Sequence, residues 1–400
     1  MLITTLQKEV NNMLNVKTGQ SIKADAAAAG KEAASLAKEG MNDIKMAFVY
    51  SGVQYDQKKL LDSISDEMPG VPLIGNTSFT GVITPEGFIS SDDGFVGIMA
   101  LSDPELRVGV AGMPKEGTAR ETGHKVAEKA LAAAGTDKAP SYFYMSAPPG
   151  EEEYYLKGIT EVIGRVPFFG GSAADNTITG EWLLYTDEMV TADGVSVAFF
   201  YSDKPFANVF TGAYNETTNA GVITKIDGDR TLVEIDGIKA LDKYREWTGA
   251  SAEDVAGGNL LAYAVCKPLA VKDRLGDLAA IRHPMNGNDD GSIAIGNNLA
   301  VGTAVIQMEA SVDELIDSVG KTLEELKDRL GGSIAGLHLV HCGGRRAGIG
   351  DRIDEVVRKI RMTVGFVPMI VEFTFGEYGY EDDGNNTCGG LMLSFTAFGK

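Results

Sequence analysis

One pattern of elements occurs three times along the chain and constrains its fold more than any single residue does. Each copy has a helix, a short apolar strand, a second helix, a Val-Pro pair and two further strands. The three pairs are Val71-Pro72, Val166-Pro167 and Val367-Pro368. Similar segments in the same order indicate one structural unit that is used repeatedly. We therefore expect three α/β units whose backbones superpose.

The segments of the first copy have compositions that suit this order. Residues 21–39 are rich in alanine with charged residues interspersed, and they end at Gly40, which is typical of a helix with a glycine stop. Residues 46–50 are a short apolar run, which indicates a buried strand. A second helix is predicted from apolar residues at helical spacing. These are Leu60, Leu61, Ile64 and Met68.

Strands joined by tight turns follow the Val-Pro pairs of the first two copies. Asp93-Gly94 and Asp193-Gly194 occupy matching turns between apolar runs, and Asp-Gly at such a place favours a hairpin. Each unit therefore supplies antiparallel neighbours as well as strands that are joined through helices. We expect an α/β fold of two domains, in which helices cover mixed β-sheets built from repeated helix-strand-helix-strand-strand units.

The composition changes between about residues 215 and 250, where β-like pieces alternate with Asp-Gly turns. This stretch is typical of a hairpin insertion and marks a natural domain border. We expect an N-terminal domain at residues 1–225, which holds the first two copies. A C-terminal domain at residues 226–400 then holds the third copy.

Charge and cysteine usage exclude several classes of partner. The formal net charge of −20 repels phosphate backbones and anionic lipid surfaces, so we expect neither nucleic-acid binding nor membrane insertion. Three sparse cysteines, Cys266, Cys342 and Cys388, make no disulfide framework and no zinc spacing. No secretory signal and no apolar run of membrane-spanning length is present. We expect a soluble cytoplasmic protein.

The first candidate site is the polar loop of the third copy, which differs most from the other two. Cys342-Gly343-Gly344-Arg345-Arg346 follows a predicted strand. A thiol beside glycines and two guanidinium groups can have a lowered pKa and be reactive, and the glycine amides can hold an anion. The alternative is a small buried side chain, then a glycine turn and solvated arginines.

A second polar segment, Gly376-Glu377-Tyr378, follows the third Val-Pro strand. Because parallel strands joined by a helix end at the same sheet edge, we expect Cys342, Arg345 and Glu377 to converge on one cleft, with Tyr378 or Asn386 nearby. Arg345 would bind a carboxylate and Glu377 an ammonium group, which suits a zwitterion. The alternative is a structural salt bridge at a strand end.

The four histidines give no metal or catalytic signature. His338 and His341 lie three apart on one strand, so they point to opposite faces, and we expect no metal site. His124 and His283 are possible axial haem ligands without a diagnostic setting. No nucleotide-binding, metalloprotease, hydrolase or kinase motif is present.

The order of these motifs resembles the FIST family, the F-box and intracellular signal transduction proteins. The matching segments include MAFVYSG, VPLIGNTSFTGV, VPFFGGSAADN, LHLVHCGGRR and VEFTFGEYGYEDDGNNTCGG. The C-x-G-R element is kept as Cys342, Gly344 and Arg345, and the G-E element as Gly376 and Glu377. Three positions differ from the common family pattern and bear on the ligand. They are Asn76, His341 and Arg346.

The resemblance implies a sensory module that binds small ligands such as amino acids. We expect a protein that binds an amino acid or small carboxylate and signals to a separate protein, such as a sensor kinase or chemoreceptor, without a cofactor. The expected ligand-binding residues are Cys342, Gly344, Arg345, Arg346, Gly376, Glu377, Tyr378 and Asn386.

Two alternatives remain open from the sequence. Some relatives bind haem and sense nitric oxide, which makes a haem-binding gas sensor one alternative. The other is a thiol-dependent enzyme with Cys342 as nucleophile and His338 or His341 as base. His341 points away from the face of Cys342, which weakens the enzyme hypothesis.

Overall fold

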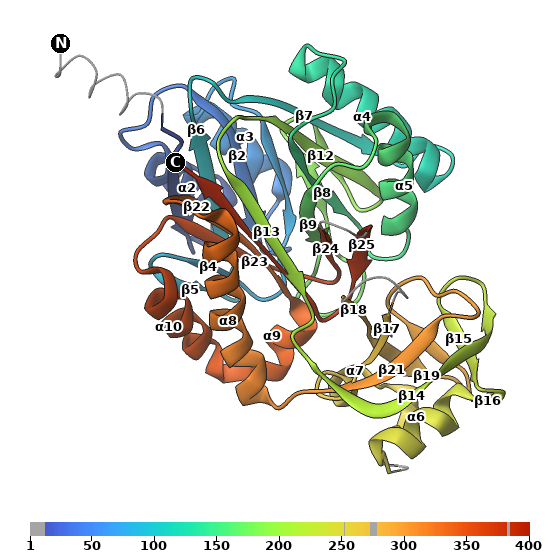
Figure 1. Ribbon diagram of the computed structural model, residues 1–400. Helices are drawn as coiled ribbons and strands as arrows, with labels where there is room; N and C mark the ends of the chain where they lie inside the picture. The colour runs from blue at the N-terminus through green and yellow to red at the C-terminus, as the bar shows by residue number, and fades with distance from the viewer. Residues whose placement is uncertain (1–12, 252, 273–277, 382–384) are drawn as a thin grey trace.

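The structure, a computed structural model, describes residues 13–251, 253–272, 278–381 and 385–400. Within these residues the strands form three six-stranded sheets and a fourth sheet of eight strands. The three six-stranded sheets and their helices form one body, and the fourth sheet lies beside it at lower right in Figure 1.

Each six-stranded sheet has the same plan in its first four positions. Two parallel strands lie at the centre, a third pairs antiparallel with the first of them, and a fourth forms the edge. From the edge inward, the first copy supplies β1 (Asn15–Ser21), β6 (Val96–Ser102), β2 (Ile44–Ser51) and β3 (Leu73–Thr77). The second supplies β7 (Arg107–Pro114), β12 (Gly194–Tyr201), β8 (Tyr142–Ala147) and β9 (Phe168–Ser172). The third supplies β13 (Phe206–Thr211), β26 (Leu393–Gly399), β22 (Ile334–Cys342) and β23 (Met369–Thr374).

A hairpin from a different copy completes each sheet. The hairpin of β4 (Val82–Thr84) and β5 (Gly87–Ile89) leaves the first copy and pairs with β23 of the third. The hairpin of β10 (Leu184–Thr186) and β11 (Met189–Thr191) leaves the second copy and pairs with β3 of the first. The hairpin of β24 (Glu377–Tyr380) and β25 (Asn386–Gly389) leaves the third copy and pairs with β9 of the second. The exchange therefore runs once around all three copies.

Helices cover the outer face of each sheet. The pairs are α2 (Ala26–Lys38) with α3 (Gln57–Glu67), α4 (Ala119–Ala134) with α5 (Glu152–Ile163), and α8 (Val312–Leu330) with α10 (Ile353–Val364). Local signals set their ends. α8 begins in a reciprocal capping box between Ser311 and Glu314 and ends at Gly331, whose φ of 64° suits glycine. The loop predicted after β22 folds into the short α9 (Gly343–Ile349) and a 3₁₀ turn (Gly350–Arg352).

The inner faces of the three sheets pack against one another in a common core. Buried side chains from every copy meet there, among them Phe48 of β2, Tyr144 of β8 and Ile370 of β23. This core is rich in aromatic rings, such as Phe48 and Tyr144, whose centroids lie 5.1 Å apart in an edge-to-face arrangement. The three copies are therefore joined by apolar packing as well as by exchanged hairpins.

Residues 215–309 form the fourth sheet and its helices, which we call the β-domain. Its elements are β14 (Asn215–Asp227), β15 (Thr231–Ile235), β16 (Ile238–Lys239), α6 (Ala240–Thr248), a 3₁₀ turn (Ala256–Gly258), α7 (Leu261–Ala264), β17 (Leu269–Lys272), β18 (Ala279–Arg282), β19 (Pro284–Gly287), β20 (Ile293–Ile295) and β21 (Ala304–Glu309). It has a separate core around Ile223, Tyr244 and Leu269. The β-domain contacts α9 through α7, and so lies next to the carboxyl end of β22 (Figure 1).

The predicted fold class is confirmed. The chain is an α/β protein with mixed sheets covered by helices in two domains, and the Val-Pro pairs directly precede β3, β9 and β23, which hold the same place in their sheets.

The exchanged hairpins should contribute strongly to stability. Ile83 of β4 is fully buried in the core of the third copy, opposite Val371. We expect Ile83→Ala to lower the free energy of unfolding by about 2–5 kcal/mol, the usual cost of such a cavity. Val301→Ala is the control, because Val301 is exposed and should change stability by less than about 0.5 kcal/mol. Urea unfolding of both variants measures this, and equal midpoints would show that the hairpin adds little.

Candidate functional site

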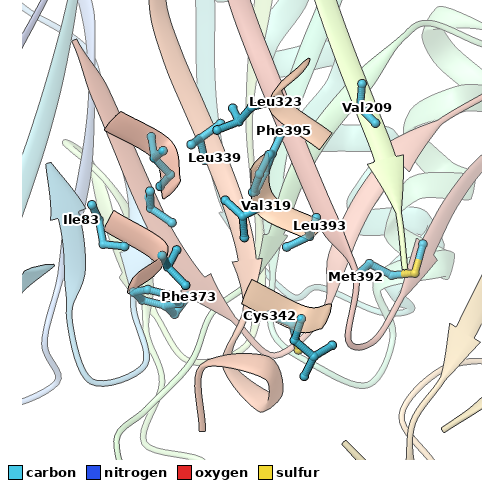
Figure 2. Packing of buried hydrophobic residues seen from close by; sticks show 14 of the residues in the cluster. Ile83, Val209, Val319, Leu323, Leu339, Cys342, Phe373, Met392, Leu393 and Phe395 are labelled. Carbon is cyan, nitrogen blue, oxygen red and sulfur yellow. The ribbon is translucent and has the colours of Figure 1, made fainter. Parts of the chain in front are cut away.

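The third-copy loop begins with a buried thiol. Cys342 ends β22 and caps α9, where its Sγ accepts a hydrogen bond of 3.3 Å from the N–H of Gly344. Cys342 belongs to the buried hydrophobic cluster of the third copy, which also includes Leu393 and Phe373 (Figure 2). Burial, and then the nearby Glu377 carboxyl, raise the pKa of the Cys342 thiol above its ordinary value. The thiol is therefore protonated at neutral pH.

Glu377 lies against this thiol. Its carboxyl accepts hydrogen bonds of 2.9 Å from the hydroxyl of Thr374 and of 2.8 Å from the N–H of Met392. Burial raises the pKa of Glu377 to about 8, although these two bonds, the Cys342 thiol and the charge of Arg345 oppose the rise. A carboxyl with this pKa is mostly protonated at pH 7.

Arg345 lies in the same cluster but is held by the protein itself. Its guanidinium donates to the carbonyl oxygens of Gly212 at 2.7 Å and Leu315 at 3.1 Å, and to the hydroxyl of Ser318 at 2.5 Å. It also lies 5.6 Å from the ring centre of Tyr214. Arg345 thereby joins the end of β13, α8 and α9, and it is fully buried.

The other predicted residues are distributed around this cluster. Arg346 donates to the carbonyl of Gly350 at 2.9 Å and lies 4.8 Å from the ring centre of Phe88, so it faces the hairpin of the first copy. The carbonyl of Gly376 accepts a hydrogen bond of 2.7 Å from the N–H of Ser172. The hydroxyl of Tyr378 bonds that of Ser172 at 2.7 Å. Both residues therefore face the second copy.

Asn386 lies on the second strand of the hairpin that begins with Glu377, at the end far from Glu377. It pairs with Tyr380 in the register of β24 and β25, and it donates a bond of 2.8 Å to the carbonyl of Val166. The structure thus brings Cys342, Arg345 and Glu377 together and leaves Asn386 at the other end of the hairpin.

The β-domain adds a histidine that the sequence did not single out for this place. His283 is buried, and its Nε2 lies 3.0 Å from the carbonyl oxygen of Leu261. A Cβ atom at Gly344 would lie 3.5 Å from its ring, so the imidazole packs directly over the loop of the third copy. Burial lowers the pKa of His283 to about 4, which keeps it neutral at pH 7.

An ion pair between two carboxylates and one arginine joins the β-domain to the second copy. Arg230 contacts Glu152 at 2.9 Å and Glu153 at 2.6 Å, at the start of α5. Asn297 of the β-domain donates to Glu152 at 3.3 Å. Burial and the neighbouring Glu153 raise the pKa of Glu152 to about 7, against the attraction of Arg230. We call Glu152, Glu153, Arg230 and Asn297 the seam cluster.

The seam cluster and the Cys342 loop lie on neighbouring parts of the same boundary. A Cβ atom at Gly376 would lie 3.5 Å from the carboxyl of Glu152, and Asn297 and His283 both lie beside Gly390. The boundary follows the carboxyl ends of parallel strands, where α/β proteins bind ligands. One signal in the sequence was the run Glu151-Glu152-Glu153 at the start of α5, in the turn that follows β8. No motif near Arg230 or Asn297 in the sequence indicates their contact with Glu152, because both residues come from the β-domain.

The histidines and acidic residues form no metal centre in the described part of the chain, where no three metal-ligating side chains are grouped. His341 Nδ1 lies 3.1 Å from the carbonyl of Cys342, and His338 bonds Tyr50. In the hydrogen bonds just described, the partners of the two imidazoles are the Cys342 carbonyl and the Tyr50 hydroxyl, and not the Cys342 thiol. No helix in the described residues has the length and apolar character needed to cross a membrane.

Family models match most of the chain. A FIST N domain matches residues 45–238 and a FIST C domain matches residues 240–380. A search of curated proteins found no match. Two solved structures show weak overall likeness. Cyanuric acid hydrolase from A. caulinodans is 12% identical, with 97% of this chain and 100% of that chain covered and a TM-score of 0.38. PurLQS from Thermotoga maritima is 9% identical, with coverage of 96% and 72% and a TM-score of 0.22. Neither likeness informs the function.

The architecture and these matches define the class: an α/β protein with a sensory domain pair. The chain belongs to the FIST family, with a FIST N domain followed by a FIST C domain. FIST domains are signal-transduction sensor domains that bind small ligands.

The contacts of Arg345 predict a structural cost for its replacement. One Arg345 nitrogen donates to Gly212 and the other to Leu315 and Ser318. Lys has all its donors on a single nitrogen and cannot reproduce this fork, so Arg345→Lys leaves buried acceptors unpaired. We expect a loss of about 1.5–3 kcal/mol in the free energy of unfolding for each charged hydrogen bond removed. Arg358→Lys on the exposed face of α10 is the control and should be neutral. If urea unfolding gave the same midpoint for Arg345→Lys and wild type, the contacts described for Arg345 would carry no stability.

Proposed function

We propose that this protein is a cytoplasmic sensor that binds a small zwitterion or carboxylate, such as an amino acid, and signals to a separate protein such as a sensor kinase or chemoreceptor. The ligand binds at the boundary between the β-domain and the body. The seam cluster binds its charged groups, and the loop of the third copy forms the adjoining wall. Gly344, which lies beside His283, and Gly376, which lies beside Glu152, line that wall.

The observation that carries this proposal is the pairing of Arg230 with Glu152 and Glu153 across the boundary. An arginine and two carboxylates at one place are the groups that recognise the two ends of a zwitterion. Gly296 and Asn298 also accept hydrogen bonds from Arg230, but Arg230 is one-fifth exposed, whereas Arg345 is fully buried and therefore less suited to this role. Arg230 therefore takes the ligand carboxylate, and Glu152 or Glu153 takes its ammonium group.

This arrangement also supplies a way to signal. The ion pair is a direct link between the β-domain and α5. A ligand that replaces it changes the contacts that hold the β-domain against the second copy. A ligand can shift such an equilibrium only by its differential affinity for the two arrangements. Exchange of an internal ion pair for two ligand contacts provides that difference.

A thermal-shift screen followed by calorimetry tests the ligand. A molecule that binds only the folded state raises the melting temperature by mass action, so we expect a hit among amino acids and small carboxylates. Arg230→Gln should weaken the binding of that hit by about 1.5–3 kcal/mol, the scale of a charged hydrogen bond. The control is Arg120→Gln, which removes an exposed pair with Glu161 on α4 and α5. Equal affinity in the wild type and Arg230→Gln would contradict the proposed site.

The two alternatives are tested on the same purified protein. A thiol-dependent enzyme needs a thiolate at Cys342, whereas its raised pKa predicts alkylation at neutral pH that is much slower than that of free cysteine. Cys342→Ser is the control, because it shows whether the alkylated cysteine is Cys342 or another one. Rapid modification of Cys342 would favour the enzyme. An absorbance spectrum after incubation with haem tests the gas sensor, and a Soret band lost in one histidine variant would favour it.

A further inference from the structure

Polar side chains from all three copies meet where the inner faces of the sheets pack together. They are Tyr50 and Asn76 of the first copy, Tyr144 and Ser146 of the second, and His338 and Glu372 of the third, and we call them the axial cluster. All six are fully buried. The cluster lies beside the aromatic core and is separate from the seam cluster and from Cys342.

Glu372 is the residue on which the contacts converge. Asn76 Nδ2 donates to one carboxyl oxygen at 2.9 Å, and the hydroxyl of Tyr144 lies 3.4 Å from the other. His338 Nε2 lies 3.7 Å from the same oxygen. Asn76 Oδ1 in turn accepts bonds of 2.9 Å from both Tyr144 and Ser146. Partners from all three copies therefore meet around one carboxyl group.

His338 is enclosed by aromatic rings. Its ring centroid lies 4.6 Å from that of Phe48 and 5.2 Å from that of Phe169. Its Nε2 and the hydroxyl of Tyr50 are 2.5 Å apart. Its Nδ1 has no hydrogen-bond partner among the described residues. This setting favours a neutral imidazole, because a second proton would place a charge in an apolar cage.

Two glycines pair with cluster residues in the strand register, Gly97 with Tyr50 and Gly171 with Ser146, and neither has free space beside it. A Cβ atom at Gly97 would lie 2.9 Å from Val82, and one at Gly171 would lie 2.6 Å from Thr374. Side chains thus already fill the space beside these strands. The ligand that a filled polar cluster can still take up or release is a proton.

Within the described residues, only neutral or acidic groups face Glu372 apart from His338. These are Tyr50 from β2, Asn76 from β3, Tyr144 from β8 and, farther away, Tyr185 from β10. His338 from β22 alone lies within ion-pair distance of it. A buried carboxylate without a cation is costly. We propose that Glu372 is a proton-binding site that reports pH to all three copies: protonated, it lets them pack together, and ionised, it loosens their common core.

The pKa values agree with this assignment. Burial raises the pKa of Glu372 to about 8 and lowers the pKa of His338 to about 3, so the proton lies on the carboxyl. A raised folded pKa means that the folded state binds the proton more tightly than the unfolded state. The resulting stability is complete below the unfolded value near 4.5 and is lost as pH rises through about 8.

Two variants separate Glu372 from other buried acids. Glu372→Gln keeps the shape but cannot ionise. Glu377→Gln is the matched control, because Glu377 has a similar pKa but its carboxyl accepts its hydrogen bonds from Thr374 and Met392 of the third copy. Between pH 7 and 8, the folding equilibrium constant of the wild type should fall by about fivefold more than that of Glu372→Gln. After correction for the base-catalysed intrinsic rate, hydrogen-exchange protection in β2, β3 and β8 should fall more steeply with pH in the wild type and in Glu377→Gln than in Glu372→Gln.

Infrared spectroscopy gives a second test, because it detects the protonated carboxyl directly. With isotope-labelled glutamate at pH 6.5, a band of a protonated buried carboxyl should be present and should vanish on alkaline titration. In Glu372→Gln this carboxyl band should lack the component that comes from Glu372. The proposal is overturned if this component persists in Glu372→Gln, if His338 proves to be the protonated partner by NMR, or if protection in β2, β3 and β8 has the same pH dependence in the wild type and in Glu372→Gln.

Discussion

Strand pairing between copies is the interaction on which the rest of the structure depends. The pairs β23–β4, β3–β10 and β9–β24 each join two different copies. No sheet is completed by its own copy, so the three inner faces are drawn together around one core. This closure has two consequences. It buries polar groups from every copy beside the core, and it leaves the carboxyl ends of the central strands of the third and second copies facing the β-domain.

The two polar regions differ in what they can do. The seam cluster lies at a boundary between domains, where Arg230 is still one-fifth exposed, and domain boundaries are usual places for small ligands. The axial cluster is fully buried, and the site proposed there binds a proton. A ligand that moved the β-domain would change the outer contacts of the body, and a proton whose release loosened the core would change its inner packing. Sensing of a small molecule and of pH are therefore compatible in one fold.

Buried acids are the common physical theme. Glu152, Glu372 and Glu377 are each fully buried, and burial raises the pKa of each. Hydrophobic side chains of similar volume would fit these positions at lower cost in stability. Their presence indicates a role beyond packing, since strongly perturbed groups cluster at functional sites. Only Glu152 has an arginine partner within ion-pair distance among the described residues, which suits it to exchange that partner for a ligand.

The sequence by itself determined the units and their class. The repeated Val-Pro pairs and the alanine-rich helix predict helices and strands, because such signals act within a few residues. The hairpins predicted at Asp93-Gly94 and Asp193-Gly194 are wrong, because β6 and β12 pair with strands other than β5 and β11. The same reasoning placed Cys342 and Glu377 at neighbouring strand ends, where they are found in contact. Whether they bind a ligand stays a prediction.

Only the tertiary structure decided what those side chains meet. Arg345 turned inward to backbone carbonyls rather than to a cleft, because the ends of β13 and α8 leave those acceptors beside it. Arg230 reached Glu152 from a separate domain, and Tyr50, Tyr144 and Glu372 met from three copies. Contacts between residues hundreds of positions apart depend on how the sheets close, and no local pattern in the chain encodes that closure.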